Sequence, residues 1–295
     1  MTRFDPSVDG WDGTSGGHAC TAGSNLAVWL NSPCQSTLGT VRAVRRVFQT
    51  GTRFSPPSDR RRMATAVLFD LDDTLYSYPP CNRAGKEAAR EATRERGYAF
   101  DAPEFEAFYQ IGREEVKRHL SGTAASHERL LYFKHALEDH TGSPQPADAL
   151  AIGDAYWEGF LEAMEPFPDT VETLETLRDR GIDVAIVTNL TTRIQLRKLE
   201  RLGIADHVDL LLTSEEVGRE KPDSVLFTLP LARLDRRASE IVMVGNSVSS
   251  DIVGANAVGI ETVLFNGDVD DPASLEGRRE PDHRIDALGA VIDLV

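Results

Sequence analysis

Short apolar runs recur near residue 67 and again from residue 182 onward, and each run ends at polar residues. The runs are three to six residues long and rich in Val, Ile and Leu. Such runs are typical of strands that are buried on both faces of a parallel sheet. We therefore expect strands at 67–69, 182–187, 208–212, 241–244 and 262–265, with a minor strand at 283–286.

The segments between these runs have the apolar spacing of helices that cover a sheet. We expect helices at 170–180, 191–202, 223–234 and 250–258, and a closing helix at 288–294. Pro230 lies inside the third of these segments and should break or kink it. Strands that alternate with helices over short connections predict an α/β fold with a doubly wound, Rossmann-like parallel sheet.

Residues 81–164 have a different pattern, in which apolar side chains lie three or four positions apart. Glycine and proline divide this stretch into about four helices. We expect it to form a helical cap inserted into a core made of residues 63–80 and 165–295. Its aromatic side chains should pack the helices together, and a few of them should also face the pocket. These side chains are Phe108, Tyr132, Phe133, Tyr156 and Trp157.

Residues 1–62 differ in composition from the rest of the chain. They are rich in Gly, Ser, Thr and Pro and carry a net charge of +4, whereas the remaining residues carry −19. We expect a disordered N-terminal extension. The alternative is a basic targeting or interaction arm, because arginines cluster at 42–46 and 60–62.

Charge and hydrophobicity limit the partners of the whole chain. A net charge of −15 argues against a nucleic-acid-binding surface, and no window resembles a membrane span of ~20 apolar residues. Three cysteines without paired spacing favour a reducing compartment. We expect a cytoplasmic monomer or homodimer. Only five of the 32 basic residues are Lys, which fits a salt-rich cytoplasm, although high genomic GC content would have the same effect.

Polar side chains follow four of the expected strands at the point where each strand ends. The carboxyl ends of parallel strands meet at one edge of a sheet, so these side chains should share one crevice. Carboxylates that are close together require a shared proton or a cation between them. The residues in question are Asp70, Asp72, Thr188, Asn189, Lys221, Asn246 and Asp251.

Four motifs in this set resemble those of the haloacid dehalogenase superfamily, most of whose members are phosphatases. They are Asp70-x-Asp72-x-Thr74, Thr188-Asn189, Lys221-Pro222 and Gly245-Asn246-Ser-Val-Ser-Ser-Asp251. The helical insertion resembles the cap of the phosphoglycolate-phosphatase-like subgroup. The run at 214–222, Ser-Glu-Glu-Val-Gly-Arg-Glu-Lys-Pro, is similar to pyrimidine nucleotidases and N-acylneuraminate-9-phosphatases of that group.

The resemblance implies a role for each matched residue. Asp70 would attack phosphorus and form an aspartyl phosphate, while Asp72 would act as general acid and then base, with a pKa above that of Asp70. Thr188 and the backbone N–H of Asn189 would bind the phosphoryl oxygens. Lys221 would neutralise the charge that develops on them. Asp73 has no required role.

The resemblance also implies Mg²⁺ as cofactor. Its ligands would be the carboxylate of Asp70, the backbone carbonyl of Asp72 and a side chain of the fourth motif, either Asn246 or Asp251. Members of the superfamily usually have Asp where this chain has Asn246. The amide oxygen is still a ligand for a hard cation, but we expect weaker binding of the metal.

These observations predict a Mg²⁺-dependent phosphomonoesterase that acts on a small phosphorylated metabolite: a nucleoside monophosphate, a sugar phosphate or phosphoglycolate. A phosphomutase shares every motif, a haloacid dehalogenase lacks an equivalent of Asp72, and Asn246 leaves open a phosphometabolite-binding protein without turnover. Tyr76, Tyr78 and Arg83 lie near the start of the cap and either contact the substrate or pack.

Overall fold

The core of the molecule is a parallel sheet. The computed structural model describes residues 64–267 and 275–295, and within them it has six strands in the order β3-β2-β1-β4-β5-β6, all parallel. The predicted α/β, doubly wound fold is confirmed. The strands are β1 (Ala66–Phe69), β2 (Asp183–Thr188), β3 (Leu210–Thr213), β4 (Ile241–Gly245), β5 (Glu261–Phe265) and β6 (His283–Ile285).

The strand register places the polar motifs at one edge. β1 lies between β2 and β4, and all four of its residues are fully buried. Phe69, the last residue of β1, is paired with Ile186 of β2 and Val244 of β4. The strands β1, β2 and β4 therefore end at nearly the same level of the sheet. The residues after each strand end meet there, as the sequence predicts.

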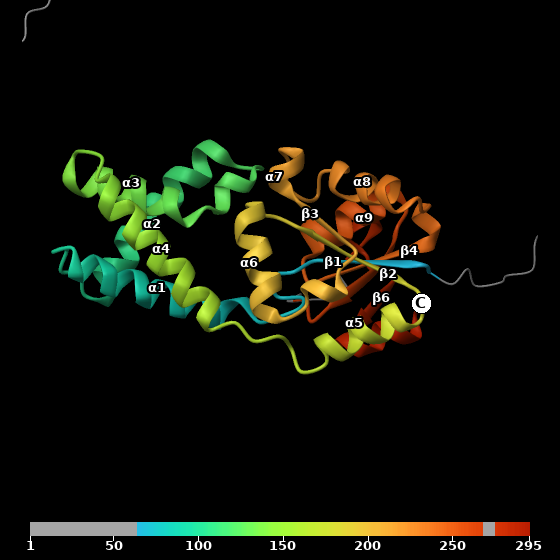
Figure 1. Ribbon diagram of the computed structural model, residues 1–295. Coiled ribbons are helices and arrows are strands. Elements are labelled where there is room, and N and C mark those ends of the chain that lie inside the picture. Colours follow the sequence, from blue (N-terminus) through green and yellow to red (C-terminus); the bar gives the residue numbers. More distant parts are fainter. Residues whose placement is uncertain (1–63, 268–274) are drawn as a thin grey trace, which may run out of the picture. The chain divides into compact units, whose positions relative to one another are not determined.

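Helices cover both faces of the sheet (Figure 1). On one face, α5 (Thr170–Asp179), α6 (Thr192–Leu202) and the 3₁₀ turn Leu288–Asp293 pack against inward side chains such as Val67 and Ile186. On the other face, α8 (Val225–Leu234) and α9 (Val253–Val258) pack against Leu68 and Val187. The short helix α7 (Ser214–Val217) follows β3.

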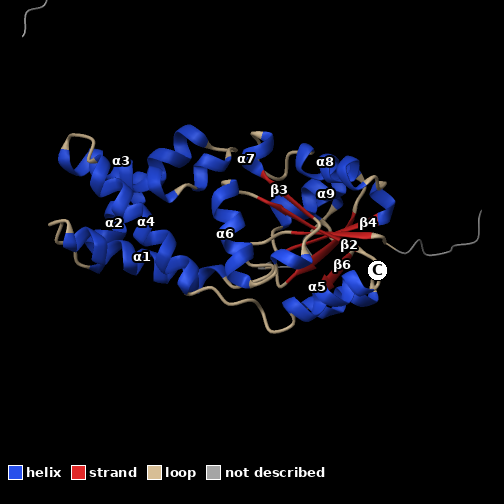
Figure 2. Cartoon of the chain, viewed as in Figure 1, coloured by secondary structure: helices blue, strands red, loops and turns tan. Residues whose placement is uncertain are grey.

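Between β1 and β2 the chain forms a group of helices (Figure 2), here called the helical insertion. It consists of α1 (Tyr78–Glu95), α2 (Ala102–Leu120), the 3₁₀ turn Ala124–His127, α3 (Arg129–Thr141) and α4 (Pro146–Glu162). Aromatic rings of different helices pack together: the Tyr156 ring of α4 lies 6.1 Å from that of Phe133 in α3 and 6.4 Å from that of Tyr109 in α2. Packing by the aromatic side chains is confirmed.

Several elements differ in detail from the expectation. The helix α8 starts at Val225 because residues 222–224 form a turn, and it continues through Pro230. Pro230 therefore does not break the helix, and the other expected effect, a kink, stays a prediction. Pro230 is buried with Leu226 and Phe227, and this burial compensates for the missing backbone N–H donor. A π-helical turn, Val248–Ile252, precedes α9, and the closing segment is 3₁₀ rather than α-helical.

Two expectations concern the chain as a whole. Residues 1–62, for which we expect disorder, lie outside the described residues. Within the described part of the chain, no helix combines the length and the apolar character needed to cross a membrane.

Candidate active site

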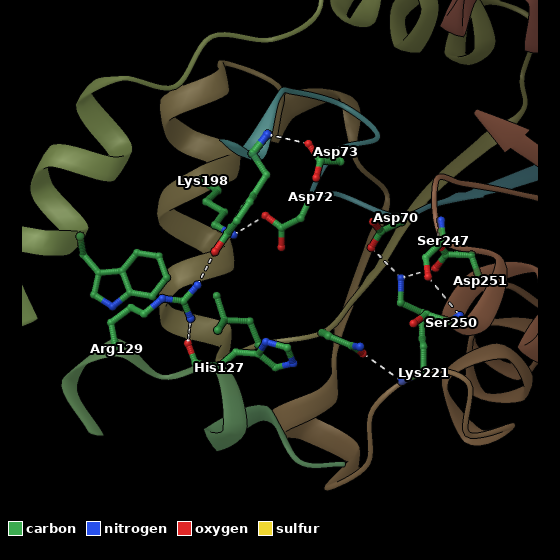
Figure 3. A pocket seen from close by; sticks show the side chains of 14 residues that line it. Asp70, Asp72, Asp73, His127, Arg129, Lys198, Lys221, Ser247, Ser250 and Asp251 are labelled. Carbon is green, nitrogen blue, oxygen red and sulfur yellow. Dashed lines mark hydrogen bonds and ion pairs between the residues drawn. The ribbon is translucent and has the colours of Figure 1, made fainter. Parts of the chain in front are cut away.

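A pocket of about 310 Å³ opens at the carboxyl edge of the sheet, next to the helical insertion (Figure 3). Core and insertion both contribute to its wall, so residues far apart in sequence face a common space. The lining residues are Asp70, Asp72, Asp73, Tyr78, His127, Arg129, Trp157, Asn189, Leu190, Lys198, Lys221, Ser247, Ser250 and Asp251.

Lys221 is held between two carboxylates. Its Nζ lies 2.6 Å from Oδ1 of Asp70 and 2.7 Å from Oδ1 of Asp251, and its side chain is only 2 % exposed. The backbone N–H of Ser247 donates to Oδ2 of Asp251 at 3.0 Å. Position 245 must be glycine, because a Cβ there would lie 2.3 Å from that same oxygen. The structure therefore brings together three of the predicted site residues.

The pKa values in this cluster reflect its burial and charge. The pKa of Asp70 is raised to about 7: burial is the largest cause, Lys221 opposes the change, and Asp251 and Asp72 add to it. Burial would lower the pKa of Lys221, but the carboxylates of Asp251 and Asp70 outweigh it and raise the value above the ordinary range of lysine. The site concentrates more negative charge than one ammonium neutralises.

Asp72 has a separate set of partners. Its Oδ1 lies 2.5 Å from Nζ of Lys198 and accepts a hydrogen bond from the Tyr76 hydroxyl, and Nε2 of Gln195 lies 3.4 Å from Oδ2. Burial raises the pKa of Asp72, but Lys198 and these hydrogen bonds lower it below its ordinary value. The expectation that the pKa of Asp72 lies above that of Asp70 is wrong for the protein without metal.

Lys198 is not among the site residues predicted from the sequence. This side chain is 1 % exposed, and its Nζ faces the rings of Phe160 and Tyr76 at 5.3 and 5.7 Å. A signal is present in the sequence: Gln195 and Lys198 lie within the apolar face of α6, whose buried residues also include Leu199 and Leu202. A lysine at such a position needs a buried partner.

The second motif is only partly exposed to the pocket. Asn189 lines it and accepts the backbone N–H of Lys221 through its side-chain oxygen at 2.9 Å. Thr188 is fully buried, and its hydroxyl oxygen accepts a hydrogen bond from Gln195 at 2.6 Å. Thr188 is not among the described residues that line the pocket. Its role in phosphate binding stays a prediction.

The donor set of the site fits a hard cation. Within the described residues, no three His, Cys, Asp or Glu side chains form a metal-binding group, so a cation would also need amide or backbone oxygens. An amide oxygen lies near the cluster: Oδ1 of Asn246, which is not among the described residues that line the pocket, lies 3.5 Å from the Thr74 hydroxyl, itself 3.4 Å from Oδ2 of Asp70. The excess of buried carboxylate around Asp70 is the charge that Mg²⁺ would balance.

The three residues near the start of the insertion have different positions. Tyr76 is fully buried against Asp72, whereas Tyr78 lines the pocket and its hydroxyl accepts a hydrogen bond from Arg129. Arg83 is exposed, and the described pocket wall does not include it. Of the aromatic residues expected to face the pocket, Trp157 does so.

Comparison with known proteins agrees with this arrangement. A family model for haloacid dehalogenase-like hydrolases matches residues 64–259. The ribulose-1,5-bisphosphate 5-phosphatase of Halopiger xanaduensis is 64 % identical over 79 % of this chain and 100 % of its own length. The glyceraldehyde 3-phosphate phosphatase of Methanopyrus kandleri is 34 % identical over 79 % of this chain and 97 % of its own length.

The chain therefore belongs to the haloacid dehalogenase-like hydrolase family. Its fold is similar to that of a 2-haloacid dehalogenase from Pseudomonas syringae pv. Tomato DC3000, with a TM-score of 0.60, 27 % identity, and coverage of 79 % of this chain and 98 % of the other. The curated relatives above are phosphatases, and the prediction of a phosphomonoesterase acting on a small phosphorylated metabolite is confirmed.

Proposed function

We propose that this phosphatase transfers the phosphoryl group of a phosphorylated sugar to Asp70 and then to water, with Mg²⁺ as cofactor. The observation that carries the proposal is the pairing of two carboxylate sites in one pocket: Asp70 with Lys221, and Asp72 with Lys198. A nucleophile beside an ammonium and a second carboxylate with its own partner are the groups needed for two-step hydrolysis.

In the first step, a carboxylate oxygen of Asp70 forms a bond to phosphorus while the bond from phosphorus to the sugar oxygen breaks. Asp72, which Lys198 keeps ionised in the free protein, takes up a proton when the anionic phosphate binds beside it, and it delivers that proton to the leaving oxygen, which becomes a hydroxyl group. Lys221 lies 2.6 Å from Asp70 and neutralises charge on the transferring group. The products of this step are the free hydroxyl of the sugar and an aspartyl phosphate.

In the second step, water attacks phosphorus and the bond to Asp70 breaks, which releases inorganic phosphate. Asp72 now accepts the proton from the water. Lys198 and Tyr76 hold its Oδ1 in place and favour the ionised form that this task requires. Residues of α6 and of the segment after β1 thus position Asp72, the base of the second step, and favour its ionised form.

Mg²⁺ would be held by the carboxylate of Asp70, the backbone carbonyl of Asp72 and a side chain of the fourth motif. Asn246 and Asp251 are the candidates for the last position. When bound, the cation would supply positive charge that keeps Asp70 ionised and stabilises the phosphoryl oxygens.

The helical insertion would act as a cap that shields the pocket from water. We propose that it comprises residues 81–164, over a core of residues 63–80 and 165–295. Support comes from contacts between the two parts: Nε2 of His127 lies 2.7 Å from Glu220, and the Thr191 hydroxyl donates to Glu128 at 3.2 Å. Closure over a reacting phosphate favours transfer to the intended acceptor.

For the substrate, we propose ribulose 1,5-bisphosphate, with the phosphate at C5 as the group transferred. The support is the similarity to the Halopiger xanaduensis phosphatase, which this chain matches over that protein's whole length. Glyceraldehyde 3-phosphate is the second candidate, because more distant relatives are phosphatases of that compound.

The test is phosphate release from these two compounds, uridine monophosphate and p-nitrophenyl phosphate, with Mg²⁺ and with EDTA. We expect Asp70→Asn to lower turnover by about 10³-fold or more, because the amide is a poor nucleophile. Asp73→Asn is the matched control. Asp73 has φ 61°, which Asn tolerates, and its Oδ1 accepts the backbone N–H of Tyr78, a bond that an amide oxygen retains.

Other outcomes would support the alternatives. Loss of substrate with phosphate retained in an isomeric product would identify a phosphomutase. Binding of phosphorylated sugars without turnover at any Mg²⁺ concentration would identify a binding protein and contradict the proposal. Equal activity in Asp70→Asn and wild type would exclude Asp70 as the nucleophile.

A further inference from the structure

Arg129 begins α3 and lies at the end of the active-site pocket away from Asp70 and Lys221 (Figure 3). The residue is 6 % exposed, and it borders both this pocket and a neighbouring cavity of about 390 Å³ within the helical insertion. Tyr78 and His127 also belong to both walls. A buried guanidinium thus lies where the catalytic pocket meets the insertion.

The hydrogen bonds of Arg129 leave most of its donors unused. One terminal nitrogen donates to the carbonyl oxygen of His127 and the other to the Tyr78 hydroxyl. Nε is buried and has no partner in the described structure. Since arginine carries five N–H donors, the two hydrogen bonds satisfy less than half of them.

Arg129 also has no counterion in the described structure. Within residues 64–267 and 275–295, no carboxylate lies within 4.0 Å of its guanidinium. Aromatic rings surround it instead, with Tyr132, Tyr156 and Trp157 at 5.1, 5.3 and 5.5 Å from the guanidinium carbon. Such cation–π contacts stabilise a buried guanidinium but do not supply the negative charge of a counterion.

Further positive charge lies on α2 beside Arg129. Lys117 and Arg113 line the neighbouring cavity, and Nζ of Lys117 is 3.2 Å from the His127 ring. The pKa of Lys117 is lowered to about 8: burial is the largest cause, Glu220 acts in the opposite direction, and Arg129 and Arg113 add to the lowering. The Glu220 carboxylate is itself 2.7 Å from His127. The neighbouring cavity, which Arg129 also borders, therefore has an excess of positive charge.

We propose that Arg129 binds a second anionic group of the substrate, a phosphate remote from the one transferred, and thereby makes the enzyme select sugar bisphosphates over monophosphates. This inference rests on the proposed phosphatase function and adds the residue that recognises the non-reacting end. A planar guanidinium with free donors matches the oxygens of a phosphate, and the substrate supplies the counterion that the protein lacks. Lys117 adds positive charge from the wall of the neighbouring cavity.

The test compares kcat/KM for ribulose 1,5-bisphosphate, ribulose 5-phosphate and p-nitrophenyl phosphate in wild type, Arg129→Met and Arg129→Lys. We expect Arg129→Met to lower the value for the bisphosphate about 10- to 100-fold and to leave p-nitrophenyl phosphate within about two-fold. Arg129→Lys should lie between, because it keeps the charge but not the planar fork. Arg118→Met, which removes an exposed arginine of α2, is the charge-matched control.

The outcomes separate the two proposals. Absence of phosphate release from every compound in wild type would refute the phosphatase function itself. An equal fall of kcat/KM for all three compounds in Arg129→Met would show that the arginine has only a structural role. An unchanged preference for the bisphosphate in that variant would overturn the inference. If Arg129→Met does not fold, Arg129→Lys and Lys117→Met provide the test instead. A loss of kcat/KM for the bisphosphate alone would support the inference, and an equal loss for all three compounds would overturn it.

Discussion

Lys221 and Arg129 are both almost fully buried cations on the wall of one pocket, yet their surroundings differ. Lys221 lies between two carboxylates, at 2.6 and 2.7 Å, and its charge is balanced within the protein. In the described structure Arg129 has aromatic rings, one carbonyl and one hydroxyl around it and no carboxylate. In the core the protein itself supplies the counterions of Lys221, whereas in the described part of the helical insertion it supplies none to Arg129.

The difference assigns the two cations to different tasks. A lysine paired with Asp251 and with Asp70, the proposed nucleophile, is positioned before substrate arrives, which is the preorganisation that electrostatic catalysis requires. An arginine without a counterion gains most when an anion enters. Under the proposed function, the residues at the strand ends of the core carry out the chemistry and those of the helical insertion select the substrate.

The largest effect we expect is on stability. Lys221→Met should lower the free energy of unfolding by about 3–5 kcal/mol, because it leaves Asp70 and Asp251 buried without a cation. Arg129→Met, which leaves no carboxylate unpaired, should lower it by only about 1–2 kcal/mol, since lost cation–π contacts are offset by relief from burying a charge. Urea denaturation without Mg²⁺ measures both. Equal losses would refute the contrast between the two sites.

Lys198→Met should lower kcat with every substrate by about 10²-fold, because Asp72 loses its ionic partner and its fixed position. The ratio of bisphosphate to p-nitrophenyl phosphate activity should stay unchanged, unlike the result expected for Arg129→Met. Steady-state kinetics on both substrates gives the answer. Lys134→Met, at a half-exposed pair with Glu138, is the control. A selective loss for the bisphosphate would place Lys198 in substrate recognition instead.

A smaller effect concerns pH. Lys117 has a pKa of about 8, so its charge is present below that pH and is lost above it. The KM for a bisphosphate should therefore rise a few-fold from pH 7 to pH 9, while that for p-nitrophenyl phosphate stays level. The Lys117→Met variant should lose this difference. A parallel pH dependence of both KM values would exclude a role for Lys117 in binding the second phosphate. The charged or titratable groups facing Lys117 are Arg113, His127, Arg129 and Glu220.

Much of the core could be predicted from the sequence, because its signals are local. Continuous apolar runs define buried strands, and polar residues directly after them, such as Asp70 and Asn189, must lie at one edge of a parallel sheet. The motif residues Asp70, Lys221 and Asp251 accordingly form one cluster.

The partners of these residues could not be predicted in the same way. Lys198 and Gln195 reach Asp72 from a helix more than a hundred positions away, and Arg129 reaches the pocket through the packing of the helical insertion. Tertiary packing sets such contacts, and it also reversed the expected order of the pKa values of Asp70 and Asp72. Burial of Pro230 likewise outweighed its helix-breaking tendency.

The most direct test of the central claim is a crystal structure of the Asp70→Asn variant with ribulose 1,5-bisphosphate and Mg²⁺. We predict that one phosphate lies beside Lys221 and the backbone of Asn189, and that the other accepts hydrogen bonds from the Arg129 guanidinium. A second phosphate that points into solvent, with Arg129 still facing only Tyr78 and His127, would contradict the division of tasks between the core and the helical insertion.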